Sequence, residues 1–502
     1  MLFLRGARLG LEELAAIALE RRPVSLEPEA RARVAAARAQ LERRLAAGDV
    51  IYGVNTGFGK LADVRIAAGD LPALQANLVR SHACGVGPAL AEAEVRGMLA
   101  LRANALAIGA SGVRPEVIEA LLAVLNAGVV PVVPEQGSVG ASGDLAPLAH
   151  LALVLIGEGE AWWQGERVAG LEALRRAGLA PLSLAAKEGL ALLNGTQAML
   201  AVGALALARA ERLARLADIA GAMSLEALRG TPVAFDVRIQ ALRPHPGQAA
   251  AAAHLRELLE DSEIRRSHLA NDPRVQDAYS LRCMPQVHGA VRDVLQFARA
   301  TAETETGAAT DNPLLVAAEQ GIEVLSGGNF HGAPLAFAFD AAAIALTSLA
   351  AIVERRIDRL VNPDLNEGLP PFLTAHPGLS SGFMIAQVTA AALLNDARVH
   401  AHPASADNTP TSGGKEDHVS MGMGAALKLR RIADDLESAL AIELLAAAEG
   451  LEHRRPLRPG RGVARAYDIV RAHARRLAED RPLAPDIAAL AAAIRSGAFA
   501  GL

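Results

Sequence analysis

Residues 137–145 of the sequence read Gly-Ser-Val-Gly-Ala-Ser-Gly-Asp-Leu, so Ser142 stands between an alanine and a glycine in a run of small side chains. Glycine has no side-chain bulk beside its amide nitrogen. In a tightly folded loop, the nitrogen of Gly143 can therefore reach the carbonyl carbon of Ala141 and close a five-membered ring with loss of water. If Ser142 also eliminates its hydroxyl, its β-carbon becomes an exocyclic methylene. That carbon would be an electrophile of a kind that no ordinary side chain supplies.

The simpler interpretation of the same segment is a helix-capping turn. Ser142 or Asp144 would then be the N-cap of a helix that begins at Leu145. An isolated Ala-Ser-Gly tripeptide favours this turn, so the covalent chemistry needs support from the rest of the chain.

Three common glycine-rich templates do not fit. The segment 53–60 ends in Gly-Lys like a phosphate-binding loop, but Val54 stands where the first glycine belongs and Leu61 replaces the Ser or Thr that would hold magnesium. Ser142 is not the centre of a nucleophile elbow, because the following glycine falls one residue early. No strand–Gly-x-Gly-x-x-Gly–helix unit is evident. We therefore expect no nucleotide, serine-hydrolase or dinucleotide site.

The elements that must position this loop differ along the chain. From about residue 195 onward, long Ala/Leu segments with charges at helical spacing predict helices over 197–228, 330–360 and 421–451, which is typical of a bundle. The earlier part shows shorter helical patterns, glycine-dense loops and a β-branched run at 129–133. We predict a mainly α fold with a long-helix bundle body and a smaller mixed α/β N-terminal domain that carries the 137–150 loop. The predicted domains are 1–195 and 196–502.

The composition is that of a globular protein without a nucleic-acid-binding surface. Of 502 residues, 51% are apolar and 21% charged, which excludes a disordered chain, and 50 basic against 55 acidic side chains give a net charge of −5. We expect no nucleic-acid partner. Three histidines lack the cysteine or carboxylate spacing of a metalloenzyme, so no metal site is expected: His400, His402 and His418.

Cysteine content and hydropathy bear on the compartment. Cys84 and Cys283 cannot form a disulfide framework, and the sequence opens without a basic-then-apolar leader, so we expect a cytoplasmic protein. Residues 333–353 are long and apolar enough to suggest a membrane span. Asp340 within them and the charged residues 354–356 after them favour a buried bundle helix and no membrane partner.

Residues 137–150 reproduce in full the motif Gly-Ser-Val-Gly-Ala-Ser-Gly-Asp-Leu-Ala-Pro-Leu-Ala-His, and here the sequence resembles the histidine, phenylalanine and tyrosine ammonia-lyase family. Further matches follow in the family's order at 52–59, 192–196, 276–283, 327–331 and 416–421. The resemblance implies a 4-methylidene-imidazol-5-one (MIO) prosthetic group formed autocatalytically from Ala141, Ser142 and Gly143, with Asp144 beside it, and no external cofactor. It also implies a homotetramer whose active sites draw residues from more than one subunit.

An ammonia-lyase must remove a β-hydrogen of low acidity while it expels an amine, so it needs an electrophile, a base and a carboxylate anchor. By resemblance, Tyr52 is the base, and Arg282 grips the substrate carboxylate with its flat guanidinium. Phe330 matches the position that packs by the prosthetic group. The resemblance implies that three further residues hold the substrate and polarise the carbonyl of the prosthetic ring: Asn194, Gln276 and Tyr279. It also counts Tyr279 among the catalytic residues. The competing interpretation of these residues is structural: they would be buried core residues or members of surface ion pairs.

Two positions bear on the choice of amino acid. Ser81-His82 occupies the place where the histidine users of the family carry Ser-His, and an imidazole can exchange hydrogen bonds with an imidazole substrate. Glu416 supports the same choice, because a carboxylate can accept from an imidazole N–H and the other family members commonly have glutamine there. The resemblance therefore predicts a catalytic Glu416 and non-oxidative elimination of ammonia from L-histidine to give trans-urocanate. A tyrosine or phenylalanine ammonia-lyase, or an aminomutase, is the alternative.

Two other classes of protein are weighed against this family. The all-helical fumarase and aspartase type also eliminates across a carbon–carbon bond, but its Gly-Ser-Ser loop with a following Met-Pro and lysine is not found in the sequence. The other class is a non-enzymatic helical scaffold. In such a scaffold the Ala-Ser-Gly tripeptide would remain ordinary main chain.

Overall fold

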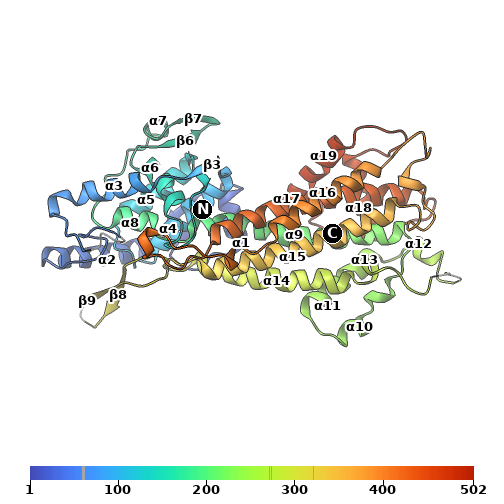
Figure 1. The fold of residues 1–502 in the computed structure, drawn as a ribbon, viewed down its shortest axis with the longest axis horizontal. Helices are drawn as coiled ribbons and strands as arrows, with labels where there is room; N and C mark the ends of the chain where they lie inside the picture. Colours follow the sequence, from blue (N-terminus) through green and yellow to red (C-terminus); the bar gives the residue numbers. More distant parts are fainter. Residues whose placement is uncertain (59–62, 271, 273, 320) are drawn as a thin grey trace. The chain divides into compact units, whose positions relative to one another are not determined.

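The computed structural model describes residues 1–58, 63–270, 272, 274–319 and 321–502 (Figure 1). Gly59, Lys60 and Leu61, which belong to the segment compared above with a phosphate loop, lie outside these described residues.

The chain divides into two compact units, each discontinuous in the sequence. Unit 1 consists of Met1–Ala208, Ala298–Asp340 and Pro403–Leu427. Unit 2 consists of Arg209–Phe297, Ala341–His402 and Lys428–Leu502. The predicted division at 195 and 196 is continuous and stays a prediction.

Unit 1 combines helices with short strands. Its helices are α1 (Leu11–Ala18), α2 (Pro28–Ala46), α3 (Leu71–His82), α4 (Glu92–Ala107), α5 (Pro115–Ala127), α6 (Leu145–Leu155), α7 (Gly170–Arg176) and α8 (Glu188–Leu193). Its strands are β1 (Leu2–Leu4), β2 (Val24–Leu26), β3 (Val86–Ala89), β4 (Val130–Pro131), β5 (Pro134–Gln136), β6 (Glu160–Trp163), β7 (Glu166–Ala169), β8 (Leu314–Ala318) and β9 (Gly321–Leu325).

The strands form small sheets rather than one large sheet. β1 pairs with β2 in parallel, whereas β3–β5, β4–β6–β7 and β8–β9 are antiparallel. Such short ladders bury little by themselves, so the helices must supply the core of unit 1.

Helix α4 forms the centre of this core, because almost all of its residues are buried and it packs against α1, α2, α5 and α6. Its Arg96 donates to the carbonyl oxygens of Ile17, Ala18 and Leu125 at the ends of α1 and α5. Carbonyl groups at helix C-termini lack partners within their own helix, so the buried guanidinium satisfies them and ties three helices together.

Helices α3, α6 and α8 contact one another. The residues that end α3, begin α6 and end α8 line the candidate site described below. In Figure 1 these helices lie among the blue to green elements of the first part of the chain.

Four of the five boundaries between the units lie within long helices: α9 (Gln197–Ala227), α14 (Met284–Thr306), α15 (Ala333–Val361) and α17 (Gly422–Glu452). Three of these helices match the helices that the Ala/Leu periodicity predicts over 197–228, 330–360 and 421–451. The mainly α prediction is therefore confirmed.

The other helices of unit 2 are α10 (Val237–Ala241), α11 (Pro246–Leu258), α12 (Glu263–Arg266), α13 (Tyr279–Arg282), α16 (Met384–His400), α18 (Arg461–His473) and α19 (Ala484–Arg495). The described residues of unit 2 form no strand. Its core is rich in alanine and leucine and contains a fully buried ion pair between Arg356 and Glu443, with Nη2 2.9 Å from Oε2.

Short 3₁₀ helices connect some of these elements: Ala68–Asp70, Pro232–Phe235, Pro371–Leu373, Ala404–Ala406 and Ser412–Gly414. The last of them ends two positions before Glu416.

Among the described helices, α15 is the one long and apolar enough to cross a membrane by length and composition, and 67% of its most apolar window is buried inside the protein. This burial favours a core helix over a membrane span.

Candidate active site

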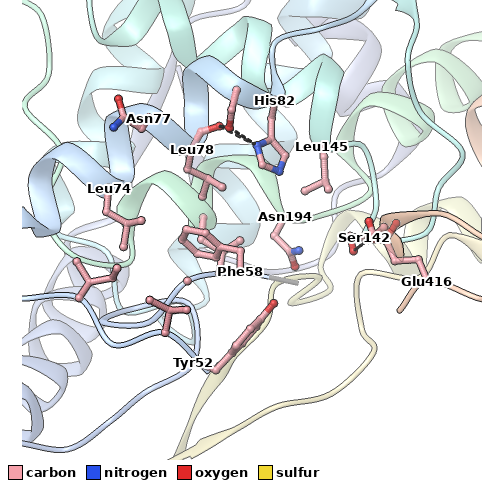
Figure 2. A pocket seen from close by; sticks show the side chains of 16 residues that line it. Tyr52, Phe58, Leu74, Asn77, Leu78, His82, Ser142, Leu145, Asn194 and Glu416 are labelled. Atoms are coloured by element: carbon pink, nitrogen blue, oxygen red, sulfur yellow. Dashed lines mark hydrogen bonds between the residues drawn. The ribbon is translucent and has the colours of Figure 1, made fainter. Parts of the chain in front are cut away.

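A cavity of about 760 Å³ lies within unit 1, and Ser142 is one of the residues that line it (Figure 2). Its size suits a small-molecule ligand. Five parts of the sequence supply the polar lining: the loop at Tyr52, the end of α3, the loop before α6, the end of α8, and the segment around Glu416. The polar residues are Tyr52, Asn77, Ser81, His82, Ser142, Asn194, Ser412 and Glu416.

The wall also has a large apolar part that the sequence analysis did not identify. It is formed by Phe58, Val64, Ile66, Leu74, Leu78, Leu145 and Leu190. In a sequence, apolar residues that line a cavity cannot be told from apolar residues of the core. The helical spacing of Leu74 and Leu78 does place them on one face of α3 with His82.

The loop that carries the Ala-Ser-Gly tripeptide is held by segments distant in the sequence. The hydroxyl of Ser420 donates to the carbonyl oxygen of Gly140 at 2.8 Å, and the amide of Gly332 donates to the same oxygen at 3.2 Å. The amide of Met421 donates to the carbonyl oxygen of Val139 at 2.8 Å. Segments of unit 1 around 332 and 420 therefore fix the backbone just before the tripeptide.

The tripeptide itself fits the predicted ring closure. Ala141 and Gly143 are buried, and Gly143 has a φ of +71°, which favours glycine. Its backbone pairs with Gly195 as an isolated parallel bridge, and a Cβ at position 143 would overlap the Gly195 carbonyl. Small residues are thus a steric requirement of this loop, as the proposed attack on the Ala141 carbonyl carbon needs.

Asp144 anchors the other side of the loop. Its Oδ1 accepts from the hydroxyl of Ser138 at 2.7 Å, and its Oδ2 accepts from the amide of Met199 at 2.8 Å, in the first turn of α9. Burial raises the pKa of the Asp144 carboxyl to about 6, although these hydrogen bonds work in the opposite direction. Because both oxygens accept hydrogen bonds within the protein, Asp144 holds the backbone of the loop in place.

Ser142 and Glu416 are in direct contact. The Ser142 hydroxyl donates to Oε1 of Glu416 at 2.6 Å, and the Thr411 hydroxyl donates to Oε2 at 2.6 Å. Burial raises the pKa of Glu416, but the hydrogen bonds from Ser142, Thr411 and Ser412 and the nearby His82 outweigh it, so the pKa lies below its ordinary value. The carboxylate is therefore ionised near neutral pH.

Thr411 is a residue that sequence reasoning missed. Its amide donates to the Glu416 carbonyl oxygen at 2.8 Å, and the two residues form an isolated antiparallel bridge across the Ser412–Gly414 turn. A hydroxyl residue five positions before an acid, with two glycines between, is a weak signal that could have indicated this turn.

His82 ends α3 and faces the cavity (Figure 2). Its Nδ1 lies 2.8 Å from the carbonyl oxygen of Leu78 and 3.0 Å from the hydroxyl of Ser81. A carbonyl oxygen can only accept, so Nδ1 carries the proton, and in the neutral ring Nε2 is left as a hydrogen-bond acceptor.

Asn194 lies at the end of α8 and is 5% exposed. Its main-chain carbonyl accepts from Arg102 Nη1 at 2.8 Å. Within the described part of the chain, its side-chain Oδ1 is buried and has no hydrogen-bond partner. A buried amide oxygen of this kind is costly to leave unpaired, so it is suited to a donor on a ligand.

Tyr52 lies in a turn and lines the same cavity. Figure 2 shows its hydroxyl directed into the cavity. The structure thus brings together five residues that the sequence analysis singled out: Tyr52, His82, Ser142, Asn194 and Glu416.

Four other predicted site residues do not line this cavity. Phe330 belongs to unit 1 and is half-buried in the turn before α15. Gln276, Tyr279 and Arg282 belong to unit 2. Gln276 is exposed and Tyr279 is 71% exposed, and the Arg282 guanidinium lies over the Tyr279 ring at 4.4 Å from its centroid. Their assigned roles stay predictions.

Over the residues that the structure describes, no group of three or more His, Cys, Asp or Glu side chains could hold a metal ion. His418 instead stacks on His331 with ring centroids 5.8 Å apart.

Comparisons with known proteins identify the family of the chain. The sequence profile "Aromatic amino acid lyase" matches residues 9–472. The chain is 57% identical to a histidine ammonia-lyase of Sorangium cellulosum over 99% of this chain and 98% of that protein, and 58% identical to one of Stigmatella aurantiaca over 98% and 96%. The crystal structure of histidine ammonia-lyase from Trypanosoma cruzi has a TM-score of 0.92 and 44% identity, covering 99% of this chain and 94% of that one.

A tyrosine aminomutase from Streptomyces globisporus is also similar in structure, with a TM-score of 0.94 and 39% identity over 100% of this chain and 98% of that one. The family profile matches most of the sequence, and two of the relatives are 57% and 58% identical to it. These matches confirm the predicted family and the predicted carbon–nitrogen lyase class. The chain belongs to the aromatic amino acid lyase family.

Proposed function

We propose that this protein eliminates ammonia from L-histidine and releases trans-urocanate. One observation supports this proposal above the others: Ser142 of the Ala-Ser-Gly tripeptide opens into the same cavity as His82 and Glu416, two groups that can hydrogen-bond an imidazole. The histidine ammonia-lyases of Sorangium cellulosum and Stigmatella aurantiaca, which are more than half identical over nearly the whole chain, support the same substrate.

The prosthetic group of the proposal is MIO formed from Ala141, Ser142 and Gly143, with no external cofactor. The loop fits it because Gly143 has no room for a Cβ against Gly195 and because Asp144 and Ser420 fix the backbone on either side. When present, the group supplies an electron-poor carbon to which the substrate amine can bind, so that the amine becomes a better leaving group.

The side chains around the cavity have distinct tasks in this proposal. The Tyr52 hydroxyl, which faces the cavity, takes the β-proton of the substrate. The unpartnered Oδ1 of Asn194 accepts from the substrate amine before it leaves. The apolar wall between α3 and α8 excludes water from the carbon whose proton is removed.

The imidazole of the substrate is held from two sides. Nε2 of His82 is an acceptor because Nδ1 donates to Leu78, and it can bind the N–H of one imidazole nitrogen. The Glu416 carboxylate is an anion that lines the same cavity, and it favours a protonated or N–H-bearing ring. A phenyl or phenol ring would leave at least one of these polar groups without a partner, which disfavours phenylalanine and tyrosine.

We propose a homotetramer in the cytoplasm, with active sites shared between subunits. Gln276, Tyr279 and Arg282 lie outside the cavity lining on the surface of unit 2, where a second copy of the chain could take them up. Arg282 would then bind the substrate carboxylate of a neighbouring subunit's cavity. The free thiols of Cys84 and Cys283 fit a reducing compartment.

One assay with three substrates tests the proposed function. The purified protein is incubated separately with L-histidine, L-tyrosine and L-phenylalanine, and the near-ultraviolet absorbance of the unsaturated acid and the release of ammonia are followed. We expect rapid formation of urocanate and little turnover of the other two. Faster turnover of tyrosine or phenylalanine would contradict the assignment, and formation of a β-amino acid without ammonia would identify an aminomutase.

A further inference from the structure

Arg102 is a fully buried residue of α4 that does not line the cavity but contacts a residue that does. Nη1 of its guanidinium donates to the main-chain carbonyl oxygen of Asn194 at 2.8 Å and to Oε1 of Gln197 at 2.7 Å. The position of Asn194, whose side chain faces the cavity, therefore depends on a cation outside the cavity lining.

We propose that Arg102 is a positioning residue of the elimination reaction. Through the carbonyl group of Asn194, it holds the Asn194 side chain where Oδ1 can accept from the substrate amine. The inference rests on the proposed function, because the reaction and the task of Asn194 belong to it. It adds a residue that touches neither the substrate nor the reacting atoms.

The main chain of Asn194 is held on both sides. Its amide donates to the carbonyl oxygen of Leu190 at 2.9 Å, and its carbonyl accepts from Arg102. The next residue, Gly195, lies against the guanidinium, because a Cβ there would overlap Arg102 Nη1. Since the main chain fixes the direction of the Cα–Cβ bond, these contacts aim the Asn194 side chain, which projects into the cavity in Figure 2.

The guanidinium has a second anchor in the first turn of α9. Oε1 of Gln197 accepts from Arg102 Nη1, and Nε2 of Gln197 donates to the hydroxyl oxygen of Thr310 at 2.8 Å. All three side chains are buried. This chain of hydrogen bonds orients Nη1 toward the Asn194 carbonyl.

Arg102 is costly to bury and is only partly satisfied. Within the described residues, its Nε and Nη2 have no hydrogen-bond partner, and burial lowers the pKa of Arg102 to about 10. Arg96, six positions earlier on α4, is also buried, but its Nε, Nη1 and Nη2 all donate to carbonyl oxygens, those of Ala18, Leu125 and Ile17. Arg96 thus stabilises the fold, whereas the costlier arrangement at Arg102 is typical of a residue kept for function.

Arg96 is therefore the matched control, because it is a buried arginine of the same helix that also donates to main-chain carbonyls. Wild type is compared with R102M, R102K, R96M and R96K. For each protein, kcat/KM is measured with L-histidine, and the inhibition constant of trans-urocanate is measured in the same assay. Urocanate has the imidazole and the carboxylate of histidine but no amine, so it makes no hydrogen bond of the kind assigned to Asn194 Oδ1.

We expect R102M to lower kcat/KM by about 10- to 100-fold, because a small displacement of Asn194 spoils the geometry of the reacting amine. The inhibition constant of urocanate should stay within about twofold of the wild-type value, since no contact to the amine is involved. R102K keeps a donor for one of the two acceptors and should recover part of kcat/KM.

We expect the opposite order for stability. R96M leaves three buried carbonyl oxygens without their donor, so its melting temperature should fall further than that of R102M. Its kcat/KM and its inhibition constant should stay close to those of wild type, and R96K should recover part of the lost stability.

An equal loss of kcat/KM in R102M and R96M would overturn the inference. So would a rise in the inhibition constant of urocanate that matches the fall in kcat/KM, because a merely loosened cavity weakens both ligands. Circular dichroism establishes whether R102M folds. If it does not, Gln197→Ala decides, because it keeps Arg102 but removes its second anchor: kcat/KM should fall while urocanate inhibition is retained, and an unchanged kcat/KM would overturn the inference.

Failure of the proposed function gives a different result. If wild type prefers L-tyrosine or L-phenylalanine, the proposed substrate is wrong, and the same comparison is made with that amino acid and its unsaturated acid. If wild type releases ammonia from none of the three, the proposed function is overturned and the inference with it.

Discussion

The backbones of Gly143 and Gly195 lie against each other, 52 positions apart in the sequence, and the Gly195 carbonyl oxygen also accepts from the Asp144 amide at 2.7 Å. No side chain fits between these two segments. The close approach brings the tripeptide loop to the end of α8, and hence brings Ser142 and Asn194 to one cavity.

Replacing Gly143 by alanine should both destabilise the protein and prevent maturation. Overlap with Gly195 and strain at a φ of +71° together should cost at least about 3 kcal/mol in the free energy of unfolding. Gly128 is the control, because it has a φ of +75° but open space around a Cβ, so Gly128→Ala should cost only about 1 kcal/mol. Urea unfolding and intact mass measure both effects. Equal losses in the two variants would show that crowding at Gly143 has no importance.

Replacing Ser142 by alanine should abolish turnover of L-histidine and leave the fold unchanged. The variant lacks the oxygen that must leave to form the electrophile, so we expect activity to fall by at least about 10³-fold. In the mature wild type the Ser142 oxygen has already left, so the variant removes no hydrogen bond to Glu416, and we expect the free energy of unfolding to change by no more than about 1 kcal/mol. Urocanate absorbance and circular dichroism measure these outcomes. Substantial residual activity would refute the role given to Ser142.

The raised pKa of Asp144 predicts a specific dependence of stability on pH. In the folded chain the pKa is about 6, above the ordinary 3.8, so between these values the folded state binds a proton that the unfolded state has lost. Stability from this group is therefore fully present below about pH 4 and is lost as the pH rises through 6, by up to about 3 kcal/mol.

The comparison of wild type with Asp144→Asn isolates this contribution, because other carboxyl groups titrate alike in both proteins. We expect the free energy of unfolding of wild type, minus that of the variant, to fall as the pH rises from 4 to 7. Urea titrations at several pH values measure this difference. A difference that stays constant over the range would contradict the raised pKa.

His82→Leu should change the substrate preference more than the overall activity. The variant loses the Nε2 acceptor for the imidazole N–H, so we expect kcat/KM for L-histidine to fall by about 10- to 100-fold. L-Phenylalanine makes no such hydrogen bond and serves as the internal control. If kcat/KM falls equally for both substrates, His82 supports the cavity wall and does not read the substrate ring.

The buried ion pair between Lys187 and Asp311 should stabilise the end of the loop that leads into α8. Nζ lies 2.7 Å from Oδ2, with side-chain exposures of 0% and 1%. Lys187→Met leaves a buried carboxylate without its cation, and we expect a loss of about 3–5 kcal/mol. Adding Asp311→Asn to that variant should recover part of the loss. If the double variant is as unstable as the sum of the single variants, the two charges are not coupled.

The sequence permits prediction of the long helices and of five cavity residues, because helical periodicity and motif matches act over short stretches. It does not reveal the path of the chain in unit 1. The contacts that hold the tripeptide loop are main-chain or single hydroxyl hydrogen bonds, such as that from Ser420 to Gly140 across 280 positions, and they leave no periodic pattern.

Two other features could not be predicted from the sequence, for different physical reasons. The apolar cavity wall consists of residues such as Leu74 and Leu190 that are also typical of a core, so burial against a cavity and burial against protein have the same sequence signal. The motif containing Tyr279 and Arg282 predicts residue types for an active site, but a match in sequence carries no information on where these residues lie in the folded protein.

The discontinuity of unit 1 has a consequence for protein synthesis. The segment 403–427, which supplies Ser420 and Glu416, leaves the ribosome long after residues 137–143. Because the hydrogen bonds from Ser420 and Met421 hold the loop for the proposed ring closure, a nascent or truncated chain that ends before this segment keeps an ordinary serine at position 142. A reactive carbon would arise only once translation has passed residue 421, so incomplete chains would not expose the cell's thiols and amines to it.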